Sequence, residues 1–99
     1  MSGMTSKMLD LNLATTFKKD LKKIKKQGKN KQKLDEVIEQ LQQEKPLSRK
    51  YCDHELIGKW KGYRECHVTP DWLLIYKIQL GRVRLLRLVR TGSHAELFK

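Results

Sequence analysis

The sequence predicts an α+β domain in which two helices pack on one face of a mostly antiparallel, four-stranded sheet. The prediction depends on two helical apolar stripes in the first half of the chain and on strand-like segments in the second half. The predicted order is β-α-α-β-β-β over residues 8–99, and residues 1–7 are expected to be a disordered extension. A chain of 99 residues has room for one such core and for no separate cofactor domain.

The first half of the chain predicts one strand and two amphipathic helices. Leucines alternate with polar residues over 8–14, which indicates a half-buried strand with the leucines on one side. A helix capped by Thr15 or Thr16 follows and ends before Gly28, and a second helix spans 31–43. Leu9, Leu11 and Leu13 form one side of the strand, and the helix side chains expected to face the sheet are Phe17, Leu21, Ile24, Leu34, Val37, Ile38 and Leu41.

The second half predicts three strands in antiparallel hairpins, at 60–69, 72–80 and 82–91. A Pro–Asp pair favours a type I turn between the first two strands, and a glycine separates the last two. Ser93 and Glu96 have the spacing of a capping box, so a short helical turn is expected at the C-terminal end.

The charge balance indicates a polyanionic partner. The chain has 22 Lys and Arg against 11 Asp and Glu, a formal net charge of +11, and basic proteins bind nucleic acid by displacing counterions from phosphates. No apolar run is long enough to span a membrane and no signal peptide is recognisable, so a cytoplasmic location is expected. Cys52 and Cys66 show no metal or redox spacing and are expected to be reduced thiols.

The candidate chemistry depends on the histidines, which all lie in the second half: His54, His67 and His94. RNA cleavage needs a base for the 2′-hydroxyl, cations for the transition state and an acid for the leaving 5′-oxygen. Alternation places Cys66 and Val68 in the core and His67 on the opposite face with Glu65, while Asp71 at the hairpin tip is close enough to pair with His67.

Alternative interpretations exist for these residues. A histidine at a strand end is more often a hydrogen-bonded surface group than a catalyst. His54, His67, Asp71 and His94 could also supply four zinc ligands, although no HExxH or clustered Cys/His spacing supports that. Trp60 is expected in the core, whereas Arg90 beside His94 favours phosphate binding.

Two stretches resemble the YafQ branch of the RelE superfamily of bacterial toxins. The first is 53–72, with the motif D-H-E-L-x-G-x-W-K-G-Y-R-E-C-H-V-x-P-D-W, and the second is 90–98, R-T-G-S-H-A-E-L-F. Over residues 8–44 the resemblance extends only to the strand–helix–helix layout. It implies a RelE-like fold and ribosome-dependent cleavage of mRNA without a metal or cofactor. A small antitoxin is the implied protein partner.

The resemblance also implies roles for individual positions. The implied catalytic residues are His54, His67, Asp71 and His94. Trp72 and Phe98 are implied to line the site, and Arg90 matches a phosphate-binding position. From their charge and their aromatic neighbours rather than from the resemblance, Lys61 and Arg64 are further candidate RNA contacts, and the helix lysines Lys18, Lys22 and Lys25 are expected to touch the ribosome. His94 is the candidate acid; the base is left open among His67, Asp71 and His54. The alternatives are a ParE-like gyrase inhibitor, whose family lacks this set of histidines, and a non-catalytic RNA-binding module.

Overall fold

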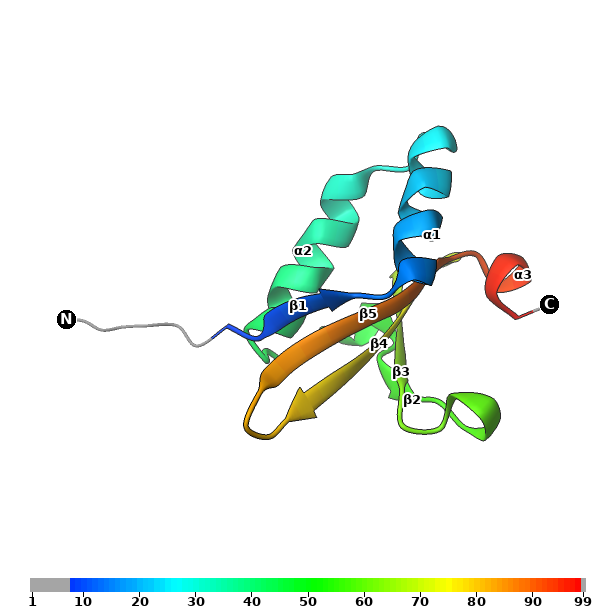
Figure 1. Ribbon diagram of the computed structural model, residues 1–99. Coiled ribbons are helices and arrows are strands. Elements are labelled where there is room, and N and C mark those ends of the chain that lie inside the picture. Colours follow the sequence, from blue (N-terminus) through cyan, green and yellow to red (C-terminus); the bar gives the residue numbers. More distant parts are fainter. Residues whose placement is uncertain (1–7, 99) are drawn as a thin grey trace.

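The computed structural model describes residues 8–98 and confirms the α+β class, with five strands in one sheet instead of the predicted four (Figure 1). The strand order is β1-β5-β4-β3-β2, antiparallel except for the parallel pair β1–β5. The strands are β1 Asp10–Leu13, β2 His54–Glu55, β3 Arg64–Thr69, β4 Trp72–Leu80 and β5 Arg84–Gly92; the helices are α1 Thr15–Lys26, α2 Lys31–Gln42 and α3 His94–Leu97.

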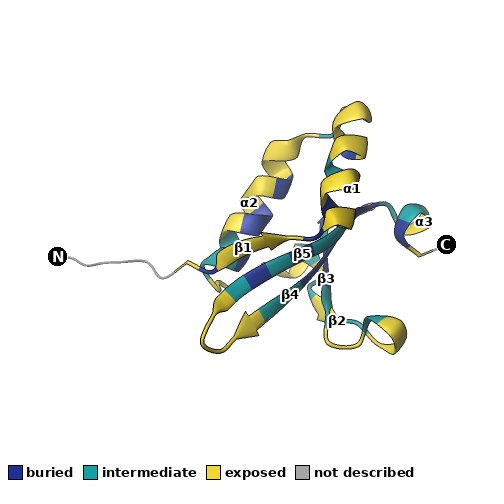
Figure 2. Cartoon of the chain, viewed as in Figure 1, coloured by how far each residue is buried: buried dark blue, intermediate teal, exposed yellow. Residues whose placement is uncertain are grey.

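Helices α1 and α2 cover one face of the sheet, as their apolar stripes predict (Figures 1 and 2). The turn between them passes through Gly28 at φ +73°, a conformation that glycine adopts without strain. The predicted cap of α1 is wrong, because Ala14 occupies the cap position and no side chain caps the helix. The hydroxyl of Thr16 instead donates to the carbonyl of Val89 in β5 (2.7 Å).

The N-terminal strand is shorter and more exposed than predicted. Leu9 is buried before the strand begins, whereas Leu11 and Leu13 are 46% and 37% exposed. Strand β1 lies at the edge of the sheet, parallel to β5, so its side chains are covered on fewer sides than those of a central strand. With Met8, these two leucines line an apolar groove beside α1 and α2.

The fifth strand is β2, which sequence patterning did not predict. Its two residues pair with the start of β3, so that His54 lies opposite Glu65. The predicted strand at 60–69 is correspondingly shorter, since Gly58–Trp60 forms a 3-10 turn and β3 begins at Arg64. Two residues carry too little periodicity to be recognised as a strand from sequence.

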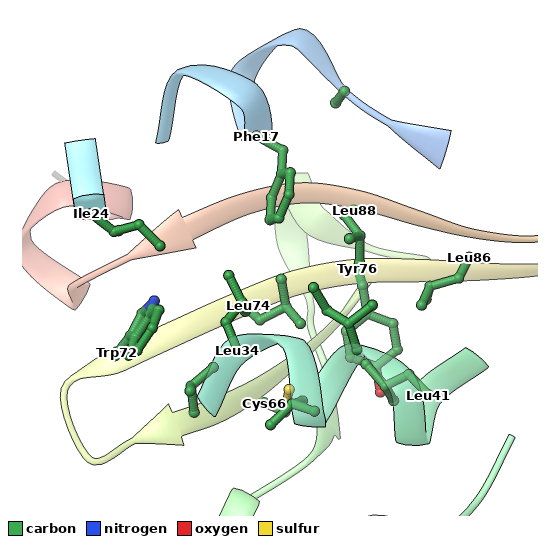
Figure 3. Packing of buried hydrophobic residues seen from close by; sticks show 14 of the residues in the cluster. Phe17, Ile24, Leu34, Leu41, Cys66, Trp72, Leu74, Tyr76, Leu86 and Leu88 are labelled. Carbon is green, nitrogen blue, oxygen red and sulfur yellow. The ribbon is translucent and has the colours of Figure 1, made fainter. Parts of the chain in front are cut away.

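The main core lies between the sheet and the two helices (Figure 3). Cys66 and Trp72 belong to it, and burial raises the pKa of the Cys66 thiol, which therefore stays protonated. A second, smaller cluster of Leu73, Ile75 and Leu97 covers part of the opposite face. We call this second side, away from α1 and α2, the open face of the sheet. No helix in the described part of the chain is long and apolar enough to cross a membrane.

A bulge changes which way the end of β5 faces. Ile75 pairs with Arg90 while Tyr76 pairs with Leu88, so Val89 is an extra residue in β5. Cross-strand partners share a face, and Arg90 is thereby paired with Ile75 of the open-face cluster instead of continuing the buried row of Leu88. The bulge therefore shifts the register of the β5 residues that follow Val89.

Candidate active site

The open face brings the histidines together from three separate elements. His54 comes from β2 and His67 from β3, where alternation places it opposite to Cys66, as predicted. His94 is the first residue of α3, which follows β5 directly. The rings of His67 and His94 have centroids 6.1 Å apart, and their planes are inclined at 68°. The two predicted catalytic groups are therefore neighbours in space although they are 27 positions apart in the sequence.

Glu65 lies between His54 and His67. Its Oε1 atom is 3.6 Å from Nε2 of His54 and 3.5 Å from Nε2 of His67, and the residue is only 3% exposed. Nδ1 of His54 is 2.7 Å from the carbonyl oxygen of Cys52. One buried carboxylate oxygen therefore faces the Nε2 atoms of two imidazole rings.

Helix α3 fixes His94 through its own capping box. The Ser93 hydroxyl accepts from the Glu96 amide (3.2 Å), and the Glu96 carboxylate accepts from the Ser93 amide (2.9 Å), as the sequence predicted. Phe98 lies next to His94 with ring centroids 5.6 Å apart. Half-exposed, it could present a ring face to an unstacked base beside His94.

Asp53 binds Arg64 and Tyr76, and these contacts hold the segment that carries His54. The Asp53 carboxylate accepts from Arg64 Nη2 (3.1 Å) and from the hydroxyl of Tyr76. This hydrogen bond to Asp53 raises the pKa of Arg64, and Arg64 shares the helix-facing side with its partner Tyr76. Arg64 also lies 3.5 Å from Glu55. It therefore holds β2 in place, and the structure does not bring it to the histidines.

Arg90 has a fixed orientation, because Asp20 of α1 binds its guanidinium. Its Nε donates to Asp20 Oδ2 (2.7 Å) and its Nη2 to Oδ1 (3.3 Å). The hydrogen bond to Asp20 raises the pKa of Arg90, so the guanidinium stays charged. Asp20 does not engage Nη1, which remains available to an anion.

Three predicted site residues are not joined to the histidines by any hydrogen bond or ion pair among residues 8–98. Trp72 is 2% exposed in the main core and donates its indole N–H to Thr91 (2.8 Å), so in this structure it packs in the core. Asp71 is exposed in the hairpin turn, and among residues 8–98 no hydrogen bond or ion pair joins it to a histidine. Lys61 is exposed in the loop before β3 and lines a groove on the β2 side.

The lysines predicted to touch the ribosome, Lys18, Lys22 and Lys25, are exposed on α1, off its buried stripe. Within the described residues no group of three or more His, Cys, Asp and Glu side chains is placed to hold a metal ion.

Two functional candidates were missed by sequence reasoning. Alternation placed Glu65 on the face of His67, which was the available signal for it, whereas nothing local pairs Asp20 with Arg90, 70 residues away.

Comparison with known proteins gives a family match over almost the whole chain. Residues 9–99 match the family described as "Bacterial toxin of type II toxin-antitoxin system, YafQ". The "mRNA interferase toxin YafQ" of Escherichia coli K12 is 44% identical over 90 residues, which cover 90% of this chain and 95% of that protein.

Solved structures agree with the sequence match. A metal-bound toxin from Helicobacter pylori is 46% identical with a TM-score of 0.85, over 92% of this chain and all of that one. YafQ in the E. coli DinJ–YafQ toxin–antitoxin complex is 44% identical with a TM-score of 0.81, over 93% of this chain and 99% of that one. Fold and sequence together define a bacterial toxin of the type II toxin–antitoxin class. The chain belongs to the YafQ family of these toxins.

Proposed function

We propose that this chain is an endoribonuclease that cleaves mRNA on the ribosome by acid–base catalysis without a metal. The observation that carries the proposal is the meeting of His67 and His94 on the open face, with ring centroids 6.1 Å apart. The relatives named mRNA interferase support the reaction class. Proton transfer by positioned side chains supplies about 10²–10⁴ in rate, which such a pair can provide.

The geometry favours a division of labour between the two rings. His94, beside Phe98 and at the exposed end of the site, donates a proton to the leaving 5′-oxygen. His67 accepts the proton of the 2′-hydroxyl, which attacks phosphorus. Glu65 lies next to Nε2 of His67 and favours a proton there, leaving Nδ1 as the basic nitrogen. His67 is a better candidate than Asp71, which is exposed and, among residues 8–98, makes no hydrogen bond or ion pair with a histidine.

The cations of the proposed site have separate tasks. Arg90 offers Nη1 to the scissile phosphate while Asp20 holds the other edge of its guanidinium. The exposed lysines of α1 provide point charges that suit ribosomal RNA, and the formal net charge of +11 favours binding to a polyanion. Phe98 beside His94 and the exposed Lys61 remain candidate contacts for the mRNA.

The proposed protein partner is an antitoxin, which would cover the apolar groove between β1, α1 and α2. This groove of about 350 Å³ is lined mainly by apolar side chains: Met8, Leu11, Leu13, Phe17, Leu21, Leu34, Ile38 and Leu88. The complex of the related YafQ with DinJ supports a protein partner of this class. Replacing Leu11 with Asp should weaken capture of the antitoxin by at least about tenfold, because the charge would be buried on binding. Leu80→Asp is the matched control, since Leu80 is also exposed (60%, against 46% for Leu11) but lies outside that groove.

The decisive experiment uses purified toxin with translating ribosomes, followed by primer extension on the mRNA. Cleavage inside the reading frame, dependent on the ribosome and unchanged by a chelator at a magnesium activity that keeps ribosomes intact, supports the whole proposal. Cleavage that requires a tightly bound metal would overturn the metal-free mechanism. This outcome has to be tested because the related H. pylori toxin was crystallised with metal. Intact transcripts with an SOS response would favour a ParE-like gyrase inhibitor, and ribosome binding without cleavage would favour a binding module.

A further inference from the structure

Helix α1 carries a polar stripe beside its apolar one. Thr16, Asp20, Lys23 and Gln27, the residue that caps the helix end, are spaced by four, three and four positions, so they lie on one side of the helix. Each of them contacts the same segment of the chain, residues 89–96, about 70 positions away in sequence. Figure 1 shows this arrangement, with α1 beside the end of β5 and α3.

Thr16 and Asp20, the first half of the stripe, supply hydrogen bonds to the part of β5 that has no neighbouring strand on the β1 side. Strand β1 ends at Leu13, opposite Leu88, so β5 continues beyond its neighbour. The Thr16 hydroxyl donates to the Val89 carbonyl, and Asp20 Oδ2 accepts from the Thr91 amide (3.1 Å) as well as from Arg90. Asp20 is itself buried, and its carboxylate accepts hydrogen bonds from both the Thr91 backbone amide and the Arg90 guanidinium.

The second half of the stripe holds α3. Lys23 Nζ lies 3.1 Å from Glu96 Oε2, and the Gln27 amide donates to the same oxygen (3.0 Å). A helix of one turn is not stable by itself in water, so its position depends on such ties. Gly92 allows the close approach, because a Cβ there would meet Glu96 Oε1 at 3.0 Å.

We infer that Thr16, Asp20, Lys23 and Gln27 form a bracket that positions Arg90 and His94 for catalysis. The catalytic consequence rests on the proposed function, whereas the positioning itself does not. Through Asp20, the bracket binds one edge of the Arg90 guanidinium. It also fixes the backbone on both sides of His94, at Thr91 and at Glu96. These four are positioning residues, since none of them touches the histidine cluster or the proposed phosphate.

The test combines two variants with two matched controls. Asp20→Asn keeps one acceptor but removes the charge facing Arg90, and Lys23→Met removes the tie to Glu96. Lys23 is 60% exposed, so its variant is expected to fold even if Asp20→Asn does not. Lys31→Met and Asp35→Asn break a comparable ion pair of 3.1 Å on α2, away from the site. NMR of the free toxin follows the His94 ring and Arg90 Nε–H signals, and single-turnover assays on ribosomes follow cleavage.

We expect Asp20→Asn to shift the Arg90 signal and Lys23→Met to shift the His94 ring signals. Each should slow single-turnover cleavage by about ten- to a hundredfold at unchanged ribosome affinity, because small misplacements of reacting groups have effects of that size. The α2 controls should change neither readout. Unmoved signals in both folded variants, or moved signals with the parent's cleavage rate, would overturn the inference. If the parent itself cuts no mRNA, the proposed function fails while the NMR shifts still decide whether the bracket positions these side chains.

Discussion

The Glu65 carboxylate lies 3.5 Å from Nε2 of His67, two residues along the same face of one strand. Because Glu65 is 3% exposed, its charge is not screened by water and acts directly on the ring. The same oxygen lies 3.6 Å from His54. One buried carboxylate thus faces two of the three histidines, which makes it the most informative residue of the site to replace.

Glu65→Gln should slow cleavage by about ten- to a hundredfold while the protein stays folded. The amide has the same shape but no charge, so it no longer attracts a protonated ring or fixes its tautomer. Single-turnover assays with the parent and the variant measure the effect. The matched control is Glu55→Gln in β2, where the side chain is 82% exposed and its loss should leave the rate unchanged. A Glu65→Gln enzyme as fast as the parent would reduce Glu65 to a packing residue.

Acid should weaken the tie between α1 and α3 in a defined window. Hydrogen bonds from Ser93 and Gln27 and the nearby Lys23 lower the pKa of Glu96 from 4.5 to about 2. A carboxylate with a lowered pKa in the folded state stabilises it above pH 4.5, and that contribution is lost as the pH falls toward 2. The free energy of unfolding should therefore differ between the parent and Glu96→Gln at pH 6, and the difference should shrink near pH 2. A difference independent of pH would show that Glu96 stabilises through packing alone.

Trp72→Phe should cost stability and leave the chemistry intact. The change removes the hydrogen bond to Thr91 Oγ1, worth about 1 kcal/mol, and adds the cost of a small cavity. Urea denaturation measures the loss, with cleavage by the folded variant assayed in parallel. Cleavage lost in a variant of unchanged stability would instead restore Trp72 as an RNA contact.

Reversing the charge of Lys18, Lys22 and Lys25 to Glu should weaken ribosome binding by about ten- to a hundredfold. Binding should also depend less steeply on salt, because fewer phosphate contacts release fewer counterions. The fold should survive since all three side chains are exposed. A triple reversal of Lys33, Lys45 and Lys50, which are also exposed but lie outside α1, matches the change in net charge. Equal losses in both triples would assign the effect to net charge instead of to α1.

Elements with strong local patterns were predictable from the sequence. The stripe of α2 predicted four buried positions, all of which are buried, and the β-prone run at 72–80 coincides with β4. The capping box at Ser93 depends on residues three apart and was also predicted. In each case the information lies within one turn or one strand, where periodicity and short-range hydrogen bonding decide the structure.

Features set by distant contacts were not predictable. Strand β2 has two residues and exists through its pairing with β3, and the exposure of Leu11 follows from the edge position of β1. The histidines were identified by their chemistry and by family resemblance, and Glu65 was placed on their face by alternation. Its burial, and the pairing of Asp20 with Arg90, required the tertiary structure, because the bulge at Val89 decides where Arg90 faces.

The most direct measurement for the central claim is single-turnover cleavage of ribosome-bound mRNA by His94→Gln. Glutamine keeps much of the size and hydrogen-bonding capacity of the ring but cannot deliver a proton to the leaving oxygen. The account predicts a folded variant that binds ribosomes and antitoxin like the parent and cuts about 10²–10⁴ times more slowly. Cleavage at the parent's rate would contradict the assignment of His94 as the acid and would make His67 the next candidate.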